Sequence, residues 1–463
     1  MLIRWTDLGA GEPEICIVGG GAAGLTLAHA LSGKGLSILL LEAGGRKPTR
    51  AGQARYEGEL VDPTSHPWLH HFRVRALGGS SRIWGGRCLP FDPIDFEART
   101  WIDGPGWPFG LQTLTPYYIQ AQDAAEAGAF DYDPRTALPG AQVELAPGLD
   151  GESFQTRLER FSKPTNLWTR YGPALEAAPD VRMLLDAPVE EIRLGETGRV
   201  DHLLVRRPDG QKTPVRARRY VLALGGLETV RLLLSSHREQ GGVGGRSGHL
   251  GRHYMSHLSA TAGQVRFARP REIAFDYERD AEGIYVRRRL ALTDAAQRRL
   301  KGLNIAFRTH LPDPQDPAHG DPILSAMYLV KNFILYEYGR RMQDGRRSAG
   351  HQARHLANIV GQPARLARFA TNWVRLRNLA ERKMPSVVLG SPSGVYALEF
   401  HAEQAPSADS RITLSDQRDA YGMPRLKVDW RMAPEDEGRL LSAYALLAEE
   451  LQRTGVGQLD YDP

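Results

Sequence analysis

The chain has 463 residues, 41% of them hydrophobic and 24% charged, and its formal net charge is +5. This length is too great for one compact core, so we expect two domains or one large two-lobed unit. The charge is small for the size and does not indicate a nucleic-acid-binding face. The only two cysteines, Cys16 and Cys88, argue against a disulfide framework and a cysteine-based zinc site.

The N-terminal stretch MLIRWTDLGAGEPE contains neither an apolar core of signal-peptide length nor twin arginines. No segment reaches the roughly 20 apolar residues that cross a bilayer. The low cysteine content fits a reducing compartment. We therefore expect a soluble, cytoplasmic protein.

The first elements in the chain have the pattern of a βαβ unit. Residues 14–19 form a β-branched apolar run typical of a buried parallel strand, and a helix with apolar residues on one side follows over 22–34. A second buried strand is expected over 37–44, so the unit closes after about thirty residues.

Less regular sequence, rich in Pro, Gly, His and Trp, follows over about 45–110, and a helix is expected over 114–127. From 181 to 225 the sequence is rich in strand patterns. The pair Asp209-Gly210 indicates a hairpin between two of them. A helix resumes at 227–236.

Past about residue 255 the sequence alternates between apolar and polar residues, which indicates an antiparallel sheet and a second domain. We expect an α/β fold: a Rossmann-like domain from 1–135 and 180–255, and a substrate domain from 136–179 and 256–463. Within the latter, 323–383 is expected to be a helical insert rich in arginine. Its charge indicates a solvated helical face or, alternatively, contact with a partner or an anionic surface.

The turn between the first strand and the first helix has the spacing Gly19-x-Gly21-x-x-Gly24, and Glu42 stands at the tip of the next strand. Such glycines allow backbone N–H groups to approach a pyrophosphate, the helix N-terminus offsets its charge, and the acid accepts from ribose hydroxyls. An acid at this position suits an adenosine with a free 2′-hydroxyl. The pattern therefore indicates FAD or NAD rather than NADP.

The run RALGGSSRIWGGRCLPFDPIDF, residues 75–96, contains too much Gly and Pro for a helix or strand. Together with the βαβ unit and the segments YVLALGGLETVRLLL, GRHYMSHL and EQAPSADSRITLS, it resembles the glucose–methanol–choline (GMC) family of FAD oxidoreductases, in the family's order along nearly the whole chain. The WGG form is most similar to the pyranose-oxidase-like bacterial branch. The resemblance implies that a flavin and its diphosphate lie beside these glycines.

The resemblance and the dinucleotide pattern together predict a set of FAD-binding residues, whereas no metal site is expected. The predicted residues are Gly19, Gly21, Ala22, Ala23, Gly24, Glu42, Ala43, Gly78, Gly79, Ser80, Ser81, Trp84, Gly85, Gly86, Val189, Ala223 and Gly225. Some family members attach FAD through a histidine just after the serine pair. Arg82 and Ile83 stand there in this chain, so we expect non-covalent FAD.

Family members use a histidine, with a nearby histidine or asparagine, in a C-terminal segment that this chain lacks. We assign no catalytic base to any of five other histidines: His66, His70, His71, His257 and His401. A second polypeptide that supplies the segment, a clipped longer protein, or a chain that has lost catalysis would each explain this end. An unfinished Rossmann domain would expose a strand edge, which favours the first two.

The expected function is oxidation of a CH–OH group, plausibly of a sugar or glycoside, by hydride transfer to flavin N5. A non-catalytic FAD-binding subunit that completes another chain is the first alternative. An NAD-dependent dehydrogenase is the second, but it needs a nicotinamide pocket to which the Gly-Ser-Trp run is poorly suited. The sequence identifies neither the substrate, the electron acceptor nor the oligomeric state.

Overall fold

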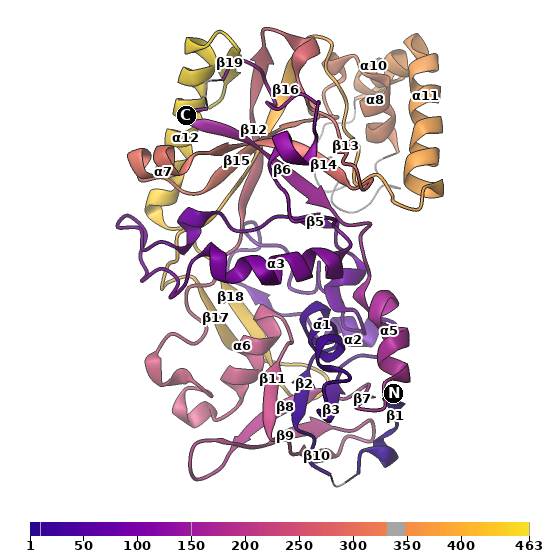
Figure 1. The fold of residues 1–463 in the computed structure, drawn as a ribbon, viewed down its shortest axis with the longest axis vertical. Coiled ribbons are helices and arrows are strands. Elements are labelled where there is room, and N and C mark those ends of the chain that lie inside the picture. Colours follow the sequence, from indigo (N-terminus) through magenta and orange to yellow (C-terminus); the bar gives the residue numbers. More distant parts are fainter. Residues whose placement is uncertain (10, 150, 331–347, 463) are drawn as a thin grey trace.

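The computed structural model describes residues 1–463 except 10, 150, 331–347 and 463, and it has two lobes (Figure 1). One lobe contains a five-stranded parallel sheet, and the other contains an eight-stranded antiparallel sheet. The expected α/β fold, a Rossmann-like sheet beside an antiparallel substrate-domain sheet with helices, is thus confirmed.

All neighbouring strands of the five-stranded sheet are parallel. Its two central strands each consist of four buried apolar residues, as expected for strands covered on both faces. In spatial order the strands are β1 (Leu2–Ile3), β7 (Val181–Leu184), β3 (Ile38–Leu41), β2 (Ile15–Val18) and β11 (Arg219–Leu222).

Two helices pack on one face of this sheet, α1 (Ala22–Leu31) and α5 (Leu167–Ala177), where Leu25 and Leu175 are fully buried. The other face is covered by helix α6 (Gly226–Ser235) and by the small antiparallel sheet β8 (Val189–Leu194), β9 (Val200–Arg206) and β10 (Lys212–Val215). The hairpin expected at Asp209-Gly210 joins β9 to β10. Helix α5 therefore belongs to the first lobe, because its apolar face completes that core, although the expected boundary placed it in the second domain.

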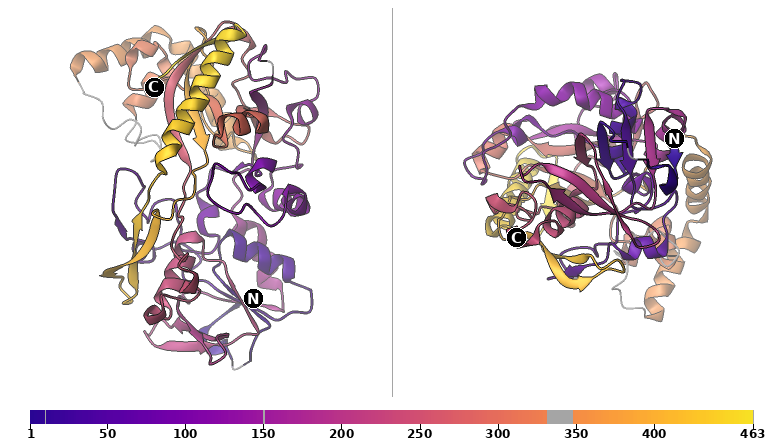
Figure 2. Two further views of the ribbon diagram at one scale, coloured as in Figure 1. Left: turned by 90° about the vertical axis from the view of Figure 1, so that its left-hand side faces the viewer. Right: turned by 90° about the horizontal axis from the view of Figure 1, so that it is seen from below.

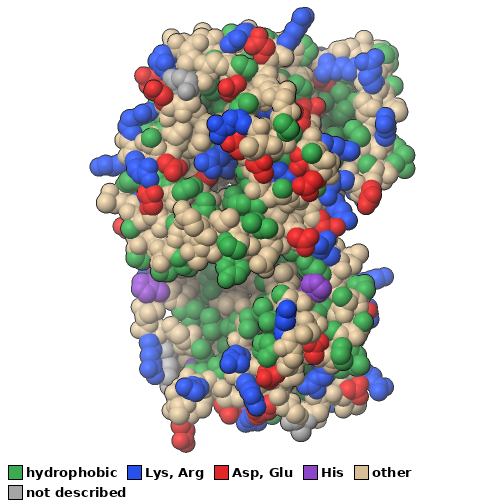
Figure 3. Space-filling model, in the orientation of Figure 1, with side chains coloured by type: hydrophobic (Ala, Val, Ile, Leu, Met, Phe, Trp, Pro, Cys, Tyr) green, Lys and Arg blue, Asp and Glu red, His purple; other side chains and the backbone are tan. Residues whose placement is uncertain are grey.

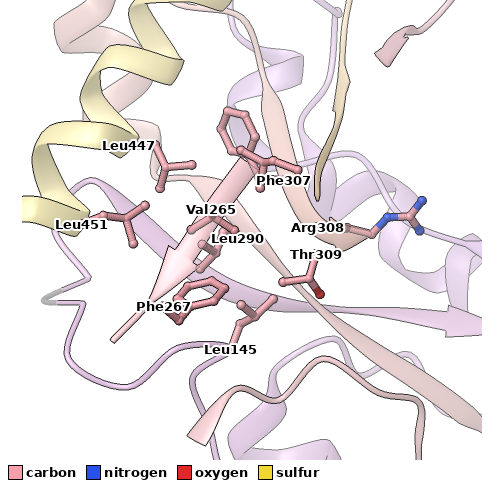
Figure 4. A pocket seen from close by; sticks show the side chains of 10 residues that line it. Leu145, Val265, Phe267, Leu290, Phe307, Arg308, Thr309, Leu447 and Leu451 are labelled. Atoms are coloured by element: carbon pink, nitrogen blue, oxygen red, sulfur yellow. The ribbon is translucent and has the colours of Figure 1, made fainter. Parts of the chain in front are cut away.

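The eight-stranded sheet forms the centre of the other lobe, and helix α12 (Pro434–Arg453) runs along one of its faces (Figure 2). Its strands in order are β19 (Gly457–Asp460), β12 (Leu258–Phe267), β16 (Val395–Ala402), β15 (Ile305–His310), β14 (Tyr285–Leu292), β6 (Phe154–Phe161) and β5 (Arg87–Cys88), with β13 (Glu278–Arg279) beside β14. A cavity of only roughly 10 Å³ remains between the sheet and α12. Apolar side chains line it, and the Arg308 guanidinium extends away from it (Figure 4). This gap is part of the packed core.

Among the described residues, the expected insert at the edge of this lobe contains the helices α8 (Pro322–Leu329), α10 (Ala349–Gly361) and α11 (Pro363–Trp373), followed by a π-helical turn at Val374–Leu379. Residues 331–347 of the insert lie outside the described residues. The hairpin β17 (Arg411–Arg418) and β18 (Pro424–Asp429) pairs with β4 (Glu59–Leu60) and packs beside α6. This C-terminal segment therefore contacts the first lobe, although we expected it in the substrate domain.

The remaining helices are short apart from α3, which begins three residues before the expected start. They are α2 (Arg50–Ala54), α3 (Leu111–Ala125), α4 (Pro134–Ala137) and α7 (Asp294–Leu300). Both cysteines are free thiols. Within the described ranges, no helix combines the length and hydropathy needed to cross a bilayer.

Candidate functional site: a dinucleotide-sized cavity

A cavity of roughly 570 Å³ lies at the carboxyl ends of β2, β3 and β11. Ligands of open α/β sheets bind at this edge, where loops leave the strands. Twelve of the predicted FAD-binding residues line it together, although the chain separates them by up to 206 positions: Gly19, Gly21, Ala22, Ala23, Glu42, Ala43, Gly79, Ser80, Ser81, Val189, Ala223 and Gly225.

The glycine turn after β2 is shaped by close backbone approaches. Gly19 has φ +110°, and a Cβ built on Gly24 would lie 1.9 Å from the carbonyl oxygen of Gly19. Gly21 is the N-cap of α1, so the first N–H groups of that helix are directed to the cavity. A helix N-terminus with free N–H groups favours a phosphate.

Glu42 follows β3 and is 6% exposed. Its Oε2 accepts from the N–H of Gly20 at 2.7 Å, and its Oε1 accepts from the N–H of Gly44 at 2.7 Å. These bonds fix both carboxylate oxygens at the cavity wall, and each oxygen keeps a lone pair. The carboxylate is therefore ready to accept from hydroxyl groups of a bound ligand.

The turn at Gly78–Ser81 packs directly against the glycine turn, and its residues 79–81 line the cavity. Gly78 and Gly79 have φ values of +94° and +51°, and a Cβ on Gly79 would lie 2.9 Å from Cα of Gly21. The Ser81 hydroxyl donates to the Gly78 carbonyl at 2.5 Å and accepts from the N–H of Leu167 at 3.2 Å. Ser81 thus holds the turn in shape, and the Ser80 hydroxyl is left as the side-chain donor of this turn.

Five predicted residues do not line this cavity: Gly24, Gly78, Trp84, Gly85 and Gly86. Gly24 allows the glycine turn to close on Gly19. Trp84 Nε1 donates to the Thr165 carbonyl at 2.9 Å, and a Cβ on Gly86 would lie 2.8 Å from the Ser162 carbonyl. Local packing therefore accounts for Gly24, Trp84 and Gly86 in the structure, whereas a Cβ on Gly85 would meet no atom within 4 Å. Contact between the Trp-Gly-Gly run and a flavin stays a prediction.

Sequence reasoning missed a group of arginines in the cavity wall: Arg55, Arg73, Arg75 and Arg231. Arg231 and Arg55 contact the buried Asp419 at 2.8 and 3.3 Å, and Arg73 contacts Glu228 at 3.1 Å. Burial lowers the pKa of Arg55 to about 10. No motif marks these residues, because the segment 55–75 meets Arg231 of helix α6 across more than 150 positions of the chain.

Tyr254 lines the cavity beside this group and bonds to His66. The Nδ1 of His66 lies 2.6 Å from the carbonyl oxygen of Pro67, which can only accept, so Nδ1 carries the proton. The Nε2, 2.9 Å from the Tyr254 hydroxyl, therefore accepts from it. Burial lowers the pKa of His66, in keeping with a neutral ring. His66 thus orients Tyr254.

The other histidines considered for a base lie elsewhere. His70 and His71 stack edge to face with ring centroids 4.4 Å apart, and neither lines the cavity. His401 lies on β16, and His257 directly precedes β12, both in the antiparallel lobe. In the part of the chain that the structure describes, no three His, Cys, Asp or Glu residues are grouped to hold a metal ion.

Comparisons with known proteins support the first lobe's fold. The family model described as an NAD(P)-binding Rossmann-like domain matches residues 17–76, which contain the glycine turn and Glu42. Paromamine 6'-oxidase of Streptomyces fradiae is 26% identical over 291 residues, which cover 53% of this chain and 54% of that protein.

Two further relatives cover different shares of the chain. 6'''-Hydroxyparomomycin C oxidase of Streptomyces lividus is 24% identical over 485 residues, covering 92% of this chain and 74% of that protein. An uncharacterized GMC-type oxidoreductase of Mycobacterium tuberculosis is 29% identical over 273 residues, covering 51% and 40%. The chain thus spans about half the length of the first relative and three quarters of the second. These matches agree with the family-level resemblance, whereas the pyranose-oxidase-like branch stays a prediction.

Proposed function

We propose that this chain, a relative of the GMC-type oxidoreductases, binds FAD and oxidises a CH–OH group. The observation that carries the proposal is a single cavity that joins the glycine turn, the fixed carboxylate of Glu42 and the Gly79–Ser81 turn at the carboxyl edge of the sheet. Two relatives are named as oxidases, one of them for a compound with a hydroxyl group in its name. A sugar or glycoside hydroxyl remains the proposed donor.

The residues in the cavity wall fit FAD by their chemistry. Glu42 would accept from the ribose hydroxyls, and the first N–H groups of α1 would bind the diphosphate. Val189, at the start of β8, would offer backbone groups to the adenine. When bound, FAD supplies the hydride acceptor. The chain's own contribution is to orient the cofactor and exclude water, and we assign no catalytic base.

We further propose that the FAD is dissociable. Arg82 and Ile83 follow the serine pair, and neither side chain forms a bond to flavin. The Arg82 guanidinium donates to the Leu77 carbonyl at 2.8 Å, so it is held against its own turn. A second polypeptide remains a proposed partner.

Anaerobic titration tests the function and separates it from its alternatives. The purified chain is loaded with FAD and mixed without oxygen with a panel of sugars and other alcohols. Bleaching of the flavin absorbance by at least one alcohol supports the oxidoreductase. If the chain binds FAD but no alcohol bleaches the flavin, either with the chain alone or after co-purification with a partner, the chain is a non-catalytic subunit. If it binds NAD in place of FAD, the proposal is contradicted.

A further inference from the structure

The antiparallel sheet has one apolar face and one charged face. Phe307 and Leu398 belong to the core under α12, whereas Arg308 and Glu399, the next residues along each strand, project from the other side. Figure 4 shows this directly, because the guanidinium of Arg308 extends away from the apolar side chains around the small core cavity. The charged face thus needs an explanation other than packing against the helix.

Arg308 lies at the centre of this face and binds two carboxylates. It is 2.8 Å from Glu159 and also contacts Glu399, and the three side chains are 10%, 2% and 5% exposed. Burial works to raise the pKa of Glu159, but the charges of Arg308 and neighbouring arginines outweigh it and lower the pKa to about 2. Both carboxylates are therefore ionised and both contact Arg308, whose Nε is buried without a hydrogen-bond partner among the described residues.

Arg87 and His401 form the open rim of the face, with side chains 35% and 27% exposed. Nε2 of His401 lies 3.2 Å from Arg308 and 3.4 Å from Arg87, closer than the 3.7 Å to Glu399. Because a guanidinium can only donate, this nitrogen is placed to accept from the two arginines. Arg87 is 3.5 Å from Glu159, a long contact. Most of its donors have no acceptor within hydrogen-bond distance among the described residues.

Two more arginines add positive charge behind this rim. Arg287 donates to backbone carbonyl oxygens, which do not neutralise it, and Nε of Arg289 is buried with no hydrogen-bond partner in the described ranges. Arg157 and Asp92 contact one another, so their charges cancel and do not change the net charge of this face. Four guanidinium groups, those of Arg87, Arg287, Arg289 and Arg308, thus face the carboxylates of Glu159 and Glu399, and a third carboxylate, Asp276, lies near Arg287. One positive charge remains in excess at this largely buried site. Such an excess is costly unless an anion joins it.

Arg87 belongs to the segment that is predicted from the sequence to lie beside the flavin. It directly follows the Trp84–Gly86 run on β5, the strand of the antiparallel sheet drawn nearest the waist between the lobes (Figure 1). The space-filling surface is hollowed at this waist, where hydrophobic side chains gather (Figure 3).

We propose that Arg87 and His401 form a subsite for a carboxylate of the substrate, so that the alcohol oxidised by this chain carries a negative charge. This inference rests on the proposed function and specifies its substrate class. Arg87 presents a planar fork that matches a carboxylate, and the excess charge behind it repels cations. Choline, which the name of another relative gives as a substrate, carries a quaternary ammonium and would be rejected here.

Calorimetry on the FAD-loaded chain tests the subsite with three sugars of similar size: glucuronate, glucose and glucosamine. We expect glucuronate to bind at least about tenfold more tightly than the other two, as one charge-assisted hydrogen-bond pair would provide. R87Q should remove this preference, and R87K should keep part of it. R266Q, which changes an exposed arginine on β12 outside the cluster, should leave it intact.

Two results would overturn the subsite: no preference for glucuronate in the wild-type chain, or a preference that survives in R87Q. Circular dichroism confirms that each variant is folded, and if R87Q is not, the wild-type ranking of the three sugars decides. The affinities of the flavin-free chain for the same three sugars distinguish a failure of this inference from a failure of the proposed function. If the chain takes up no FAD but prefers glucuronate, only the proposed function is refuted. If alcohols bleach its bound flavin but it does not prefer glucuronate, only the subsite is refuted.

Discussion

Replacing Arg308 by Met tests the electrostatics of the charged sheet face. The substitution keeps an unbranched apolar stem but leaves the carboxylates of Glu159 and Glu399 buried at 2% and 5% exposure without their shared cation. Removing one partner of a buried ion pair costs roughly 3–5 kcal/mol. We expect a loss of this size in the unfolding transition of the antiparallel lobe at about pH 7.

The loss should depend on pH with a definite sign. In the wild-type chain the pKa of Glu159 is about 2, below its ordinary value, so its contribution is present above that ordinary value and is lost as the pH falls toward 2. In R308M, burial without the guanidinium raises the pKa of both carboxylates. The deficit of the variant should therefore shrink between about pH 7 and about pH 5.

Urea unfolding at the two pH values measures this deficit. R298M provides the control, because Arg298 forms its ion pair with Glu97 on the surface, where both side chains are 46% exposed. We expect little change in R298M at either pH. A loss in R308M as small as that of R298M, or one that is equal at both pH values, would refute the reasoning.

Three further outcomes are expected. G24A should lower the free energy of unfolding by about 1–3 kcal/mol and weaken FAD uptake, since its Cβ would lie 1.9 Å from the Gly19 carbonyl oxygen. The control G85A, whose Cβ would have no atom within 4 Å, should leave the melting temperature unchanged. E42Q should weaken FAD binding about tenfold or more in fluorescence titrations, because an amide cannot accept from both Gly20 and Gly44; unchanged affinity would remove Glu42 from the site. Acid precipitation should release the flavin into the supernatant, and a yellow pellet would show covalent attachment.

The sequence predicted the parts of the site that are local in the chain. Strand, glycine turn, helix and acidic residue follow one another within 28 positions, from Ile15 to Glu42, and each step has a backbone reason, so the βαβ unit could be recognised without a structure. The purpose of single glycines was harder to predict. Gly24 and Gly86 allow backbone to approach backbone, which is not distinguishable in sequence from an approach to a ligand.

Other features depend on contacts between distant segments. Arg231 reaches Asp419 across 188 positions, and Arg87 meets His401 across 314, so no local pattern could associate them. Helix α5 was assigned to the wrong lobe for the same reason, because its partner is α1, about 140 residues earlier. Side-chain chemistry that the fold assembles from separate strands is visible only in the structure.

Titration of the refolded or natively purified chain with FAD tests the central claim most directly. We expect the folded chain to bind one FAD, with quenching of flavin fluorescence, and NAD not to compete. A folded chain that is colourless and takes up no added FAD would contradict it.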